Sequence, residues 1–360
     1  MTPEARALPG LRTPRAIAGR AIGPEEPAWI VAEIGVNHDG DPRRAAELIE
    51  SAARAGADAV KVQCFRAGAL AAPEAALSAY QRPGAAAAAG QREMLARLEL
   101  SRGAYPRLRA AAVERGLAFL ASPFDEESLE FLLSLELPAI KLGSGELTNA
   151  PLLRRAAAAG IPMMLSTGMA DWGEIEGAVL EARRSGPLDP ILLQCVSAYP
   201  TPLGAANVRA VETLARRTGC LVGYSDHTLE DEPALAARAL GACILERHLT
   251  HDRGASGPDH AVSLEEEDFR RWCAAIRRLE EALGDGEKTH TPLEEEGRRN
   301  ARKSLHARER IPAGAVIDGE MLALLRPGGG LGPEAWERVV GARATREIDE
   351  GARILEEDLA

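Results

Sequence analysis

Two histidines stand at comparable places in the sequence, each at the end of a short apolar run and each beside carboxylates. His227 lies in GYSDHT (223–228), and His248 lies in LERHLTHD (245–252). If the two runs form neighbouring parallel strands, about 4.8 Å apart, the two imidazoles can share one cation. Two nitrogen ligands completed by oxygens favour Mn²⁺ or Mg²⁺ over a structural zinc ion. The pair therefore predicts a divalent-metal site.

Two lysines interrupt apolar runs, Lys61 in AVKVQC and Lys141 in AIKLGSG. Burying a lysine is costly unless its ammonium group is paired or binds an anion. Two interpretations follow. The lysines form salt bridges with Glu33, Glu146 or Glu246, or they form an anion-binding site. In the second case, glycine-rich turns and nearby hydroxyls would add hydrogen-bond donors for phosphate oxygens, from Ser122, Ser144, Ser166 and Thr167.

Eight short apolar runs, each bounded by turn residues, alternate with amphipathic segments such as DPRRAAELIESAARAG, a helix with Asp41 as its N-cap. Eight strand–helix units in about 260 residues predict a (β/α)8 TIM barrel, whose strands bring polar residues at their carboxyl ends to one mouth. A doubly wound sheet is the alternative, but EIGVNHDG after the first run lacks the GxGxxG phosphate turn. The predicted strands are 29–37, 59–65, 117–124, 139–145, 161–168, 191–197, 221–227 and 243–249.

The composition divides the chain into four parts. Residues 1–25 predict a loose N-terminal extension, 26–285 the barrel, 286–303 a charged linker and 304–360 a small C-terminal domain. The last part is near the lower limit for a domain that folds alone, so we expect it to pack on its own barrel or on a partner's. Residues 66–90 follow the second strand and predict either a surface loop or a lid.

Charge and cysteine content exclude several classes of protein. The 360 residues carry a formal net charge of −11, which argues against a nucleic-acid partner. No apolar segment has the length of a membrane span, and the first 25 residues lack the apolar core of a signal peptide. Five cysteines without a CxxC spacing predict buried, reduced thiols. We expect a soluble cytoplasmic protein with no membrane partner.

Nine motifs occur in one order from residue 26 to the end of the chain: AEIGVNHDGD, VKVQ, ASPFD, KLGSGEL, LSTGM, CVSAYPTP, GYSDHT, ERHLTHDRGASGPDH and LRPGGG. Together they resemble the sialic acid synthases, meaning N-acetylneuraminate synthase and its legionaminate and pseudaminate relatives. The C-terminal segment resembles the antifreeze-like (SAF) domain of that family. A single motif would be a weak signal, whereas the ordered set spans almost the whole chain.

The resemblance implies condensation of phosphoenolpyruvate with an N-acylated amino sugar, such as N-acetylmannosamine, to give a nine-carbon 2-keto acid and phosphate. It also implies a divalent metal, Mn²⁺ before Mg²⁺ or Co²⁺, held by His227 and His248. The carboxylates with acid–base or water-handling roles correspond to Glu33 and Glu146. The phosphoenolpyruvate positions fall on Lys61, Ser122, Lys141, Ser144, Ser166 and Ser225. The sugar positions fall on Gln63, Tyr199 and Asp259.

The small C-terminal domain also has a role in this resemblance. Arg326 matches an arginine that reaches into a partner subunit's barrel and contacts the N-acyl group of the sugar. The resemblance therefore implies a domain-swapped homodimer, in which each small domain completes its neighbour's site.

The sequence leaves the acceptor sugar open. Some family members have Asn in a CxNxYP turn, where this chain has Ser197, and Asn after the PG of the second loop, where this chain has Ala85. The acceptor is therefore an N-acyl hexosamine or a diacetamido-trideoxyhexose that leads to legionaminate or pseudaminate. A non-catalytic barrel that serves polysaccharide assembly is a third hypothesis. The retained Glu33, Lys61 and Lys141 argue against it.

Overall fold

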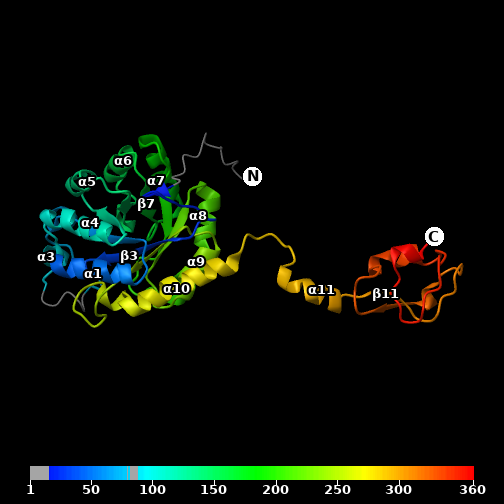
Figure 1. Ribbon diagram of the computed structural model, residues 1–360. Coiled ribbons are helices and arrows are strands. Elements are labelled where there is room, and N and C mark those ends of the chain that lie inside the picture. Colours follow the sequence, from blue (N-terminus) through cyan, green and yellow to red (C-terminus); the bar gives the residue numbers. More distant parts are fainter. Residues whose placement is uncertain (1–15, 79, 82–87) are drawn as a thin grey trace. The chain divides into compact units, whose positions relative to one another are not determined.

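The computed structural model describes residues 16–78, 80–81 and 88–360, so Ala85 lies outside the described residues. The chain divides into two compact units, Met1–Gly284 and Asp285–Ala360 (Figure 1). None of the helices in the described ranges is both long enough and apolar enough to cross a membrane.

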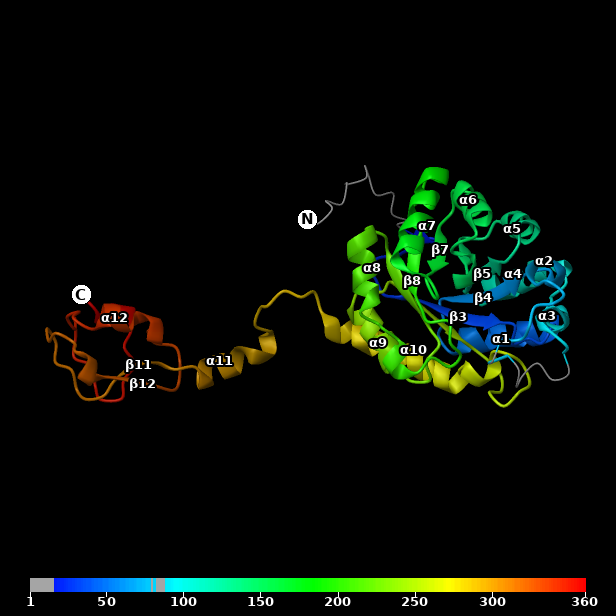
Figure 2. The same cartoon turned by 180° about the vertical axis from the view of Figure 1, so that it is seen from behind.

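Parallel strands form the sheet of the first unit, and each predicted run contains one of them. They are β3 (Trp29–Gly35), β4 (Ala59–Cys64), β5 (Ala118–Pro123), β6 (Ile140–Leu142), β7 (Met163–Ser166), β8 (Ile191–Gln194), β9 (Val222–Asp226) and β10 (Ile244–His248). They are hydrogen-bonded in the order β5-β4-β3-β10-β9-β8-β7-β6. The end strands β5 and β6 are also in contact, so the sheet curls into a nearly closed barrel (Figure 1, Figure 2). This order confirms the predicted TIM barrel and excludes the doubly wound sheet, whose strand order reverses.

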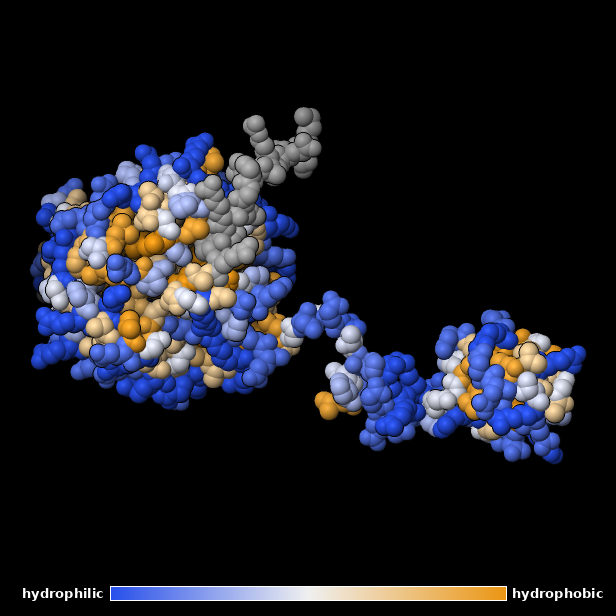
Figure 3. Space-filling view, turned by 45° about the horizontal axis from the view of Figure 1, so that its top comes forward, coloured by the Kyte–Doolittle hydropathy of each residue, from blue (hydrophilic) through white to orange (hydrophobic). Residues whose placement is uncertain are grey.

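Helices surround the barrel: α1 (Pro42–Arg54), α4 (Tyr105–Glu114), α5 (Glu126–Leu133), α6 (Ala150–Ala158), α7 (Trp172–Ser185), α8 (Ala210–Thr218), α9 (Glu232–Ala239) and α10 (Glu266–Leu283). The predicted N-cap of α1 is confirmed, because Asp41 accepts a hydrogen bond from the backbone N–H of Arg43. Apolar helix faces pack on outward side chains of the strands, such as Ile30, Ala32 and Ile34. Their charged faces leave the periphery of the first unit hydrophilic (Figure 3).

The described part of the predicted N-terminal extension is not loose. A hairpin of two short strands, β1 (Ala16–Ile17) and β2 (Arg20–Ala21), precedes β3. Ile17 and Ile22 are buried among the inward-facing residues at the amino ends of the barrel strands. Burial of such a side chain stabilises a fold by about 1.5–3 kcal/mol. The prediction for residues 1–25 was wrong here because it overlooked these two isoleucines.

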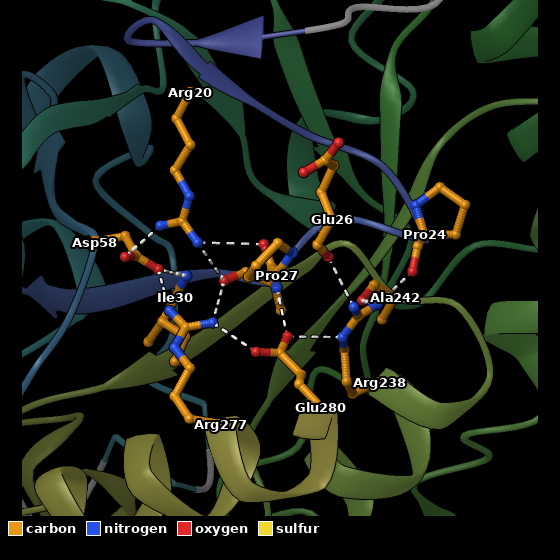
Figure 4. Close-up of polar contacts among 11 residues, drawn as sticks. Arg20, Pro24, Glu26, Pro27, Ile30, Asp58, Arg238, Ala242, Arg277 and Glu280 are labelled. Atoms are coloured by element: carbon orange, nitrogen blue, oxygen red, sulfur yellow. Dashed lines mark hydrogen bonds and ion pairs between the residues drawn. The ribbon is translucent and has the colours of Figure 1, made fainter. Parts of the chain in front are cut away.

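Charged side chains fix this segment to the base of the barrel (Figure 4). Arg238 donates to Glu280 at 2.8 Å, and Arg277 donates to Glu280 at 3.0 Å and to Asp58 at 2.7 Å. Asp58 also forms an ion pair with Arg20 of the hairpin. The same two arginines also donate to backbone carbonyls of the segment. Arg238 donates to those of Pro24 and Glu26, and Arg277 donates to that of Ala28.

The predicted insertion at 66–90 is anchored at both ends. Its described residues include α2 (Ala67–Leu70), and α3 (Gln91–Leu98) follows it. Both helices share a small apolar cluster with the loops that follow β3 and β4, formed by Val36, Phe65, Ala67, Met94, Leu95 and Leu98.

The second unit has its own apolar core, which includes Leu305, Ile311, Ile317, Leu322, Val339, Ile348 and Ile354. Its elements are α11 (Glu295–Ala301), β11 (Ser304–Ala307), β12 (Leu322–Leu325) and α12 (Trp336–Val339), with β11 and β12 antiparallel. The predicted linker 286–303 therefore contains a helix. A capping box of Thr291 and Glu294 directly before α11 provides the start signal that the charged composition concealed.

Candidate active site

Alternation along each strand separates an apolar layer from a polar layer inside the barrel. In β3, Trp29 and Val31 belong to the apolar cluster at the base, and Glu33, two residues further on, lines the mouth. In β4, Ala59 lies at the base and Lys61 at the mouth. The same change recurs on β5, β6, β7, β9 and β10, which bring polar side chains to the mouth as Ser122, Lys141, Ser166, Ser225, Glu246 and His248.

A cavity of about 410 Å³ opens at this mouth, a size that suits a small molecule. The structure brings together every barrel residue that the family resemblance assigns to the site. Thr167, the other predicted hydroxyl donor, does not line the cavity and donates instead to the carbonyl oxygen of Leu193. Arg326 follows β12 in the second unit. The predicted residues that line the cavity are Glu33, Lys61, Gln63, Ser122, Lys141, Ser144, Glu146, Ser166, Tyr199, Ser225, His227, His248 and Asp259.

The two buried lysines contact two buried carboxylates, Glu33 and Glu246, and share Glu246. Lys61 forms an ion pair with Glu33, which lies opposite it in the register of β3 and β4. Lys61 Nζ also lies 3.7 Å from Glu246 Oε2 and 3.3 Å from Ser122 Oγ. Lys141 Nζ lies 3.5 Å from Glu246 Oε1. The predicted salt bridges with Glu33 and Glu246 are therefore present.

Glu146 is separate from this cluster, so the predicted salt bridge between a lysine and Glu146 is not formed. Its Oε2 accepts a hydrogen bond from Asn149 Nδ2 at 2.6 Å. Burial raises the pKa of the Glu146 carboxyl. The cavity thus contains a carboxyl with a raised pKa away from the lysines.

Burial disfavours the charged forms of the carboxyl and ammonium groups in the lysine cluster. It raises the pKa of Glu33 and lowers that of Lys141, in each case as the largest influence. Burial also acts to raise the pKa of Glu246, but the charges of Lys141 and Lys61 outweigh it and lower this pKa to about 2. Lys61 has a raised pKa in spite of its burial, because it faces both carboxylates. An anion beside Lys141 would offset the desolvation of this lysine.

The two histidines lie level at the ends of β9 and β10. The register pairs Arg247 with Asp226, which places the following residues, His248 and His227, side by side with ring centroids 5.6 Å apart. His227 Nδ1 lies 2.7 Å from the carbonyl oxygen of Val196. Since a carbonyl only accepts, this nitrogen carries the proton and Nε2 keeps its lone pair. His248 Nδ1 is buried without a hydrogen bond.

Both imidazoles suit a metal as neutral ligands. Burial lowers the pKa of His227 to about 4 and that of His248 well below its ordinary value. Asp259 Oδ2 lies 3.8 Å from His248 Nδ1, and burial together with the charge of Glu33 raises the pKa of Asp259 to about 7. Across residues 16–78, 80–81 and 88–360, no group of three or more His, Cys, Asp or Glu side chains is arranged to hold a metal ion. The chain thus offers two nitrogen ligands, and water or substrate would supply the others.

Aromatic rings pack beside the histidines. The ring centroid of Tyr199 lies 4.2 Å from that of His227 and 6.1 Å from that of His248. Tyr80 stacks on Tyr199 with centroids 4.8 Å apart. Tyr80 belongs to the insertion after β4, so this segment reaches across the mouth to residues that follow β8. Prediction of the site missed Tyr80, because its alanine-rich surroundings have no period that indicates a direction.

Glu246 was predicted as a mouth residue and a salt-bridge partner but not as a site residue, although it is central to the site. It lines the cavity, contacts both lysines and accepts a hydrogen bond from Ser225 Oγ at 2.9 Å. The sequence did contain a signal, since Glu246 precedes His248 by two residues on one strand and therefore faces the same side.

A side chain at Gly168, in the turn after β7, would crowd the wall of the cavity. Gly168 N–H donates to Ser144 Oγ at 3.0 Å, and a Cβ atom at Gly168 would lie 2.7 Å from that oxygen and 2.5 Å from Ser197 Oγ. Cys195 Sγ lies 3.1 Å from Ser144 Oγ in the same wall. All five cysteines are buried and free of disulfides, which confirms the prediction of buried thiols.

The fold and the site define a TIM-barrel protein whose mouth combines buried cations, carboxylates and neutral imidazoles. The profile of the NeuB family matches residues 48–288, and that of the SAF domain matches residues 302–360. The chain is 40% identical over 329 residues to the N,N'-diacetyllegionaminic acid synthase of Campylobacter jejuni, covering 91% of this chain and 98% of that one. It is 38% identical over 335 residues to the synthase of the same name from Legionella pneumophila, covering 92% and 94%.

A solved structure agrees with these relatives. The N-acetylneuraminic acid (sialic acid) synthetase of Leptospira borgpetersenii, in complex with citrate, matches with a TM-score of 0.70 and 30% identity, over 78% of this chain and 94% of that one. The chain belongs to the NeuB family and ends in a SAF domain. The predicted membership of the sialic acid synthase family is confirmed.

Proposed function

We propose that the chain condenses phosphoenolpyruvate with an N-acyl hexosamine, N-acetylmannosamine or a close analogue, and water, to give a nonulosonic acid and phosphate. The observation that carries this proposal is the cluster in which Lys61 and Lys141 meet Glu33 and Glu246 beside two neutral histidines. Ion pairs that serve stability alone need neither a cavity nor an unpaired imidazole, whereas a substrate with two anionic groups needs both cations.

Phosphoenolpyruvate carries a phosphate and a carboxylate, and the cavity offers cations and hydroxyls for both. Lys61 and Lys141 would neutralise the two anionic groups. Ser166 Oγ is buried without a hydrogen-bond partner, which a phosphate or carboxylate oxygen would supply. Further hydroxyls on the cavity wall are those of Ser122, Ser144 and Ser225.

The acceptor aldehyde would lie beside the histidines, with the sugar along Gln63, Tyr199 and Asp259. The methylene carbon of phosphoenolpyruvate bonds to the aldehyde carbon, and the aldehyde oxygen takes a proton. Water then adds to the carbon that bears the phosphate and gives up a proton. As the C–O bond to phosphate breaks, the remaining hydroxyl loses its proton and becomes the keto group. The raised pKa values of Glu33 and Glu146 suit carboxyls that exchange these protons.

A divalent cation, Mn²⁺ first and Mg²⁺ or Co²⁺ as alternatives, would be held by His227 and His248. The unpaired Nδ1 of His248 and the free lone pair on Nε2 of His227 fit such an ion. When bound, it would supply positive charge beside the aldehyde oxygen and make the aldehyde carbon more electrophilic.

Phosphate release by the full chain tests the proposal. We expect release only when phosphoenolpyruvate, Mn²⁺ and an N-acyl hexosamine are all present, with loss of activity in EDTA and recovery when Mn²⁺ is returned. No release with any aldehyde of a sugar panel would overturn the proposal. Sugar binding without turnover would instead favour the non-catalytic barrel of polysaccharide assembly.

A second acceptor is favoured by the relatives, two of which are named N,N'-diacetyllegionaminic acid synthase and are 40% and 38% identical to the chain. In this version the sugar is a diacetamido-trideoxyhexose, and the chemistry is the same. Comparing kcat/KM for N-acetylmannosamine with that for such diacetamido sugars decides between the two acceptors. A pseudaminate-type acceptor belongs in the same panel.

We also propose a domain-swapped homodimer in which Arg326 contacts the N-acyl group of the acceptor in the partner's barrel. The support is the resemblance of the C-terminal segment to a SAF domain, whose profile matches residues 302–360 and therefore includes Arg326. Arg326→Ala should then raise the KM for the acceptor more than that for phosphoenolpyruvate. An equal rise in both, or a monomeric active enzyme, would contradict this role.

A further inference from the structure

Buried polar groups join two loops at the mouth. The first loop follows β3, and the second runs from Leu249 to Ser263 after β10 and carries Asp259 into the cavity. We call the connecting side chains the loop bridge. None of these described residues is among those that line the cavity. They are Asn37, Asp39, Thr250, His260 and Ser263.

At one end of the loop bridge, Asn37 holds the beginning and the end of the second loop together. Its Nδ2 donates to the carbonyl oxygen of Leu249 at 2.9 Å and to Ser263 Oγ at 2.8 Å. Ser263 Oγ in turn donates to the carbonyl oxygen of Asp259 at 2.6 Å. Asn37 and Ser263 are both fully buried, so loss of either bond would leave a polar group without a partner.

At the other end, His260 is fixed at both ring nitrogens. Nδ1 lies 2.6 Å from Thr250 Oγ1, and Nε2 lies 3.2 Å from Asp39 Oδ1 of the first loop. A Cβ atom at Gly257 would overlap the ring of His260. Because the ring is held on both sides and cannot turn away, position 257 admits only glycine. The backbone on each side of Asp259 is therefore constrained by contacts with His260 and Ser263.

We propose that the loop bridge positions Asp259 for the acceptor sugar, which makes Asn37 and His260 positioning residues. This inference rests on the proposed function. The carboxyl of Asp259 lies in the cavity, 3.8 Å from His248. A displacement of about 1 Å in a group that orients substrate can lower a rate by about 10²-fold. Buried polar bonds that neither face the cavity nor belong to a strand ladder suit this task, because they fix one geometry.

The test compares His260→Ala and His260→Gln with a matched control in the same loop, His251→Ala. His251 is over one-third exposed, and its Nε2 lies 3.8 Å from Glu47 Oε2. We expect His260→Ala to raise the KM for the acceptor about tenfold and that for phosphoenolpyruvate less than about twofold. His260→Gln, which can restore one contact, should recover part of the loss, and His251→Ala should match the wild type. Equal effects on both substrates, or an equal effect of the control, would overturn the inference.

Thr250→Val keeps the shape of the side chain and removes only the hydroxyl that contacts His260. It is a milder variant, in case His260→Ala does not fold. We expect it to raise the acceptor KM about threefold. Amide hydrogen exchange over residues 249–263 supplies a readout that needs no turnover. Exchange there should be at least about fivefold faster in Thr250→Val than in the wild type or His251→Ala. Unchanged exchange would overturn the loop bridge. A wild type that turns over no sugar, with the expected exchange pattern, would overturn the proposed function alone.

Discussion

The base and the mouth of the barrel both bury cationic side chains against carboxylates, but they differ in how these groups are satisfied. At the base, Arg238 and Arg277 donate to Glu280 and to backbone carbonyls of the N-terminal segment (Figure 4). No side-chain atom of these three residues is among the buried described atoms that lack a hydrogen bond. At the mouth, such atoms include Ser166 Oγ, Glu246 Oε2 and His248 Nδ1.

This difference separates a stabilising network from a binding site. A fully paired network has no capacity left for a ligand, and its purpose is to hold the hairpin and α10 on the base. A partly paired network is unfavourable by itself, and it persists in a protein where a ligand completes it. The following changes test whether the groups at the mouth serve function at the expense of stability. They also test whether the groups at the base serve stability without affecting function.

His248→Ala at the mouth should have the largest effect. We expect phosphate release to fall by roughly 10³-fold or more, because one of the two proposed nitrogen ligands is lost. The melting temperature should change by less than about 3 °C, since His248 Nδ1 makes no hydrogen bond in the described structure. Steady-state assays and thermal unfolding measure the two quantities. A folded variant with near wild-type activity would contradict the assignment of the histidine pair.

Lys141→Met keeps the length of the side chain and removes its charge. We expect kcat/KM for phosphoenolpyruvate to fall about 100-fold. Stability to urea should change by less than about 1 kcal/mol, because burial already disfavours the charged lysine and Glu246 retains Lys61 as a partner. A large loss of stability with an unchanged KM would instead make this lysine part of a structural ion pair.

Arg238→Met at the base should show the opposite pattern. Removing the guanidinium leaves Glu280 and three backbone carbonyls with fewer donors, so we expect a loss of about 2 kcal/mol in the free energy of unfolding. The kcat/KM of the folded enzyme should stay within about twofold. Arg278→Met, at an exposed position of α10, is the control and should change stability by less than about 0.5 kcal/mol. A large fall in kcat/KM for Arg238→Met would show that the base also serves catalysis.

Much of this comparison could be predicted from the sequence, because strand direction and side-chain alternation determine which residues meet at the mouth. Parallel strands bring their carboxyl ends to one mouth, and side chains two residues apart share a face, so Lys61 and His248 could be placed together. The contact of Tyr80 with Tyr199 could not, because it depends on the path of a segment without a hydrophobic period. The hairpin that closes the base was missed for a similar reason: Ile17 and Ile22 are too isolated in the sequence to indicate burial.

Glu146→Gln should give the smallest effect, visible as a trend with pH. The carboxyl of Glu146 has a pKa raised by burial, so the folded state favours its neutral form. Below the ordinary pKa of glutamate, near 4.5, both states are protonated and the group has no effect on stability. As the pH rises, the unfolded state ionises first and the wild type loses stability. The stability of Glu146→Gln relative to the wild type should therefore increase from pH 4 to pH 7 in urea titrations.

Glu130, whose pKa is lowered by its hydrogen bond with Arg155, is the matched control, and Glu130→Gln should show the opposite trend. A fall with pH for Glu146→Gln as well would mean that the mouth favours an ionised Glu146, and a rise for both variants would mean that the trend does not come from these carboxyls.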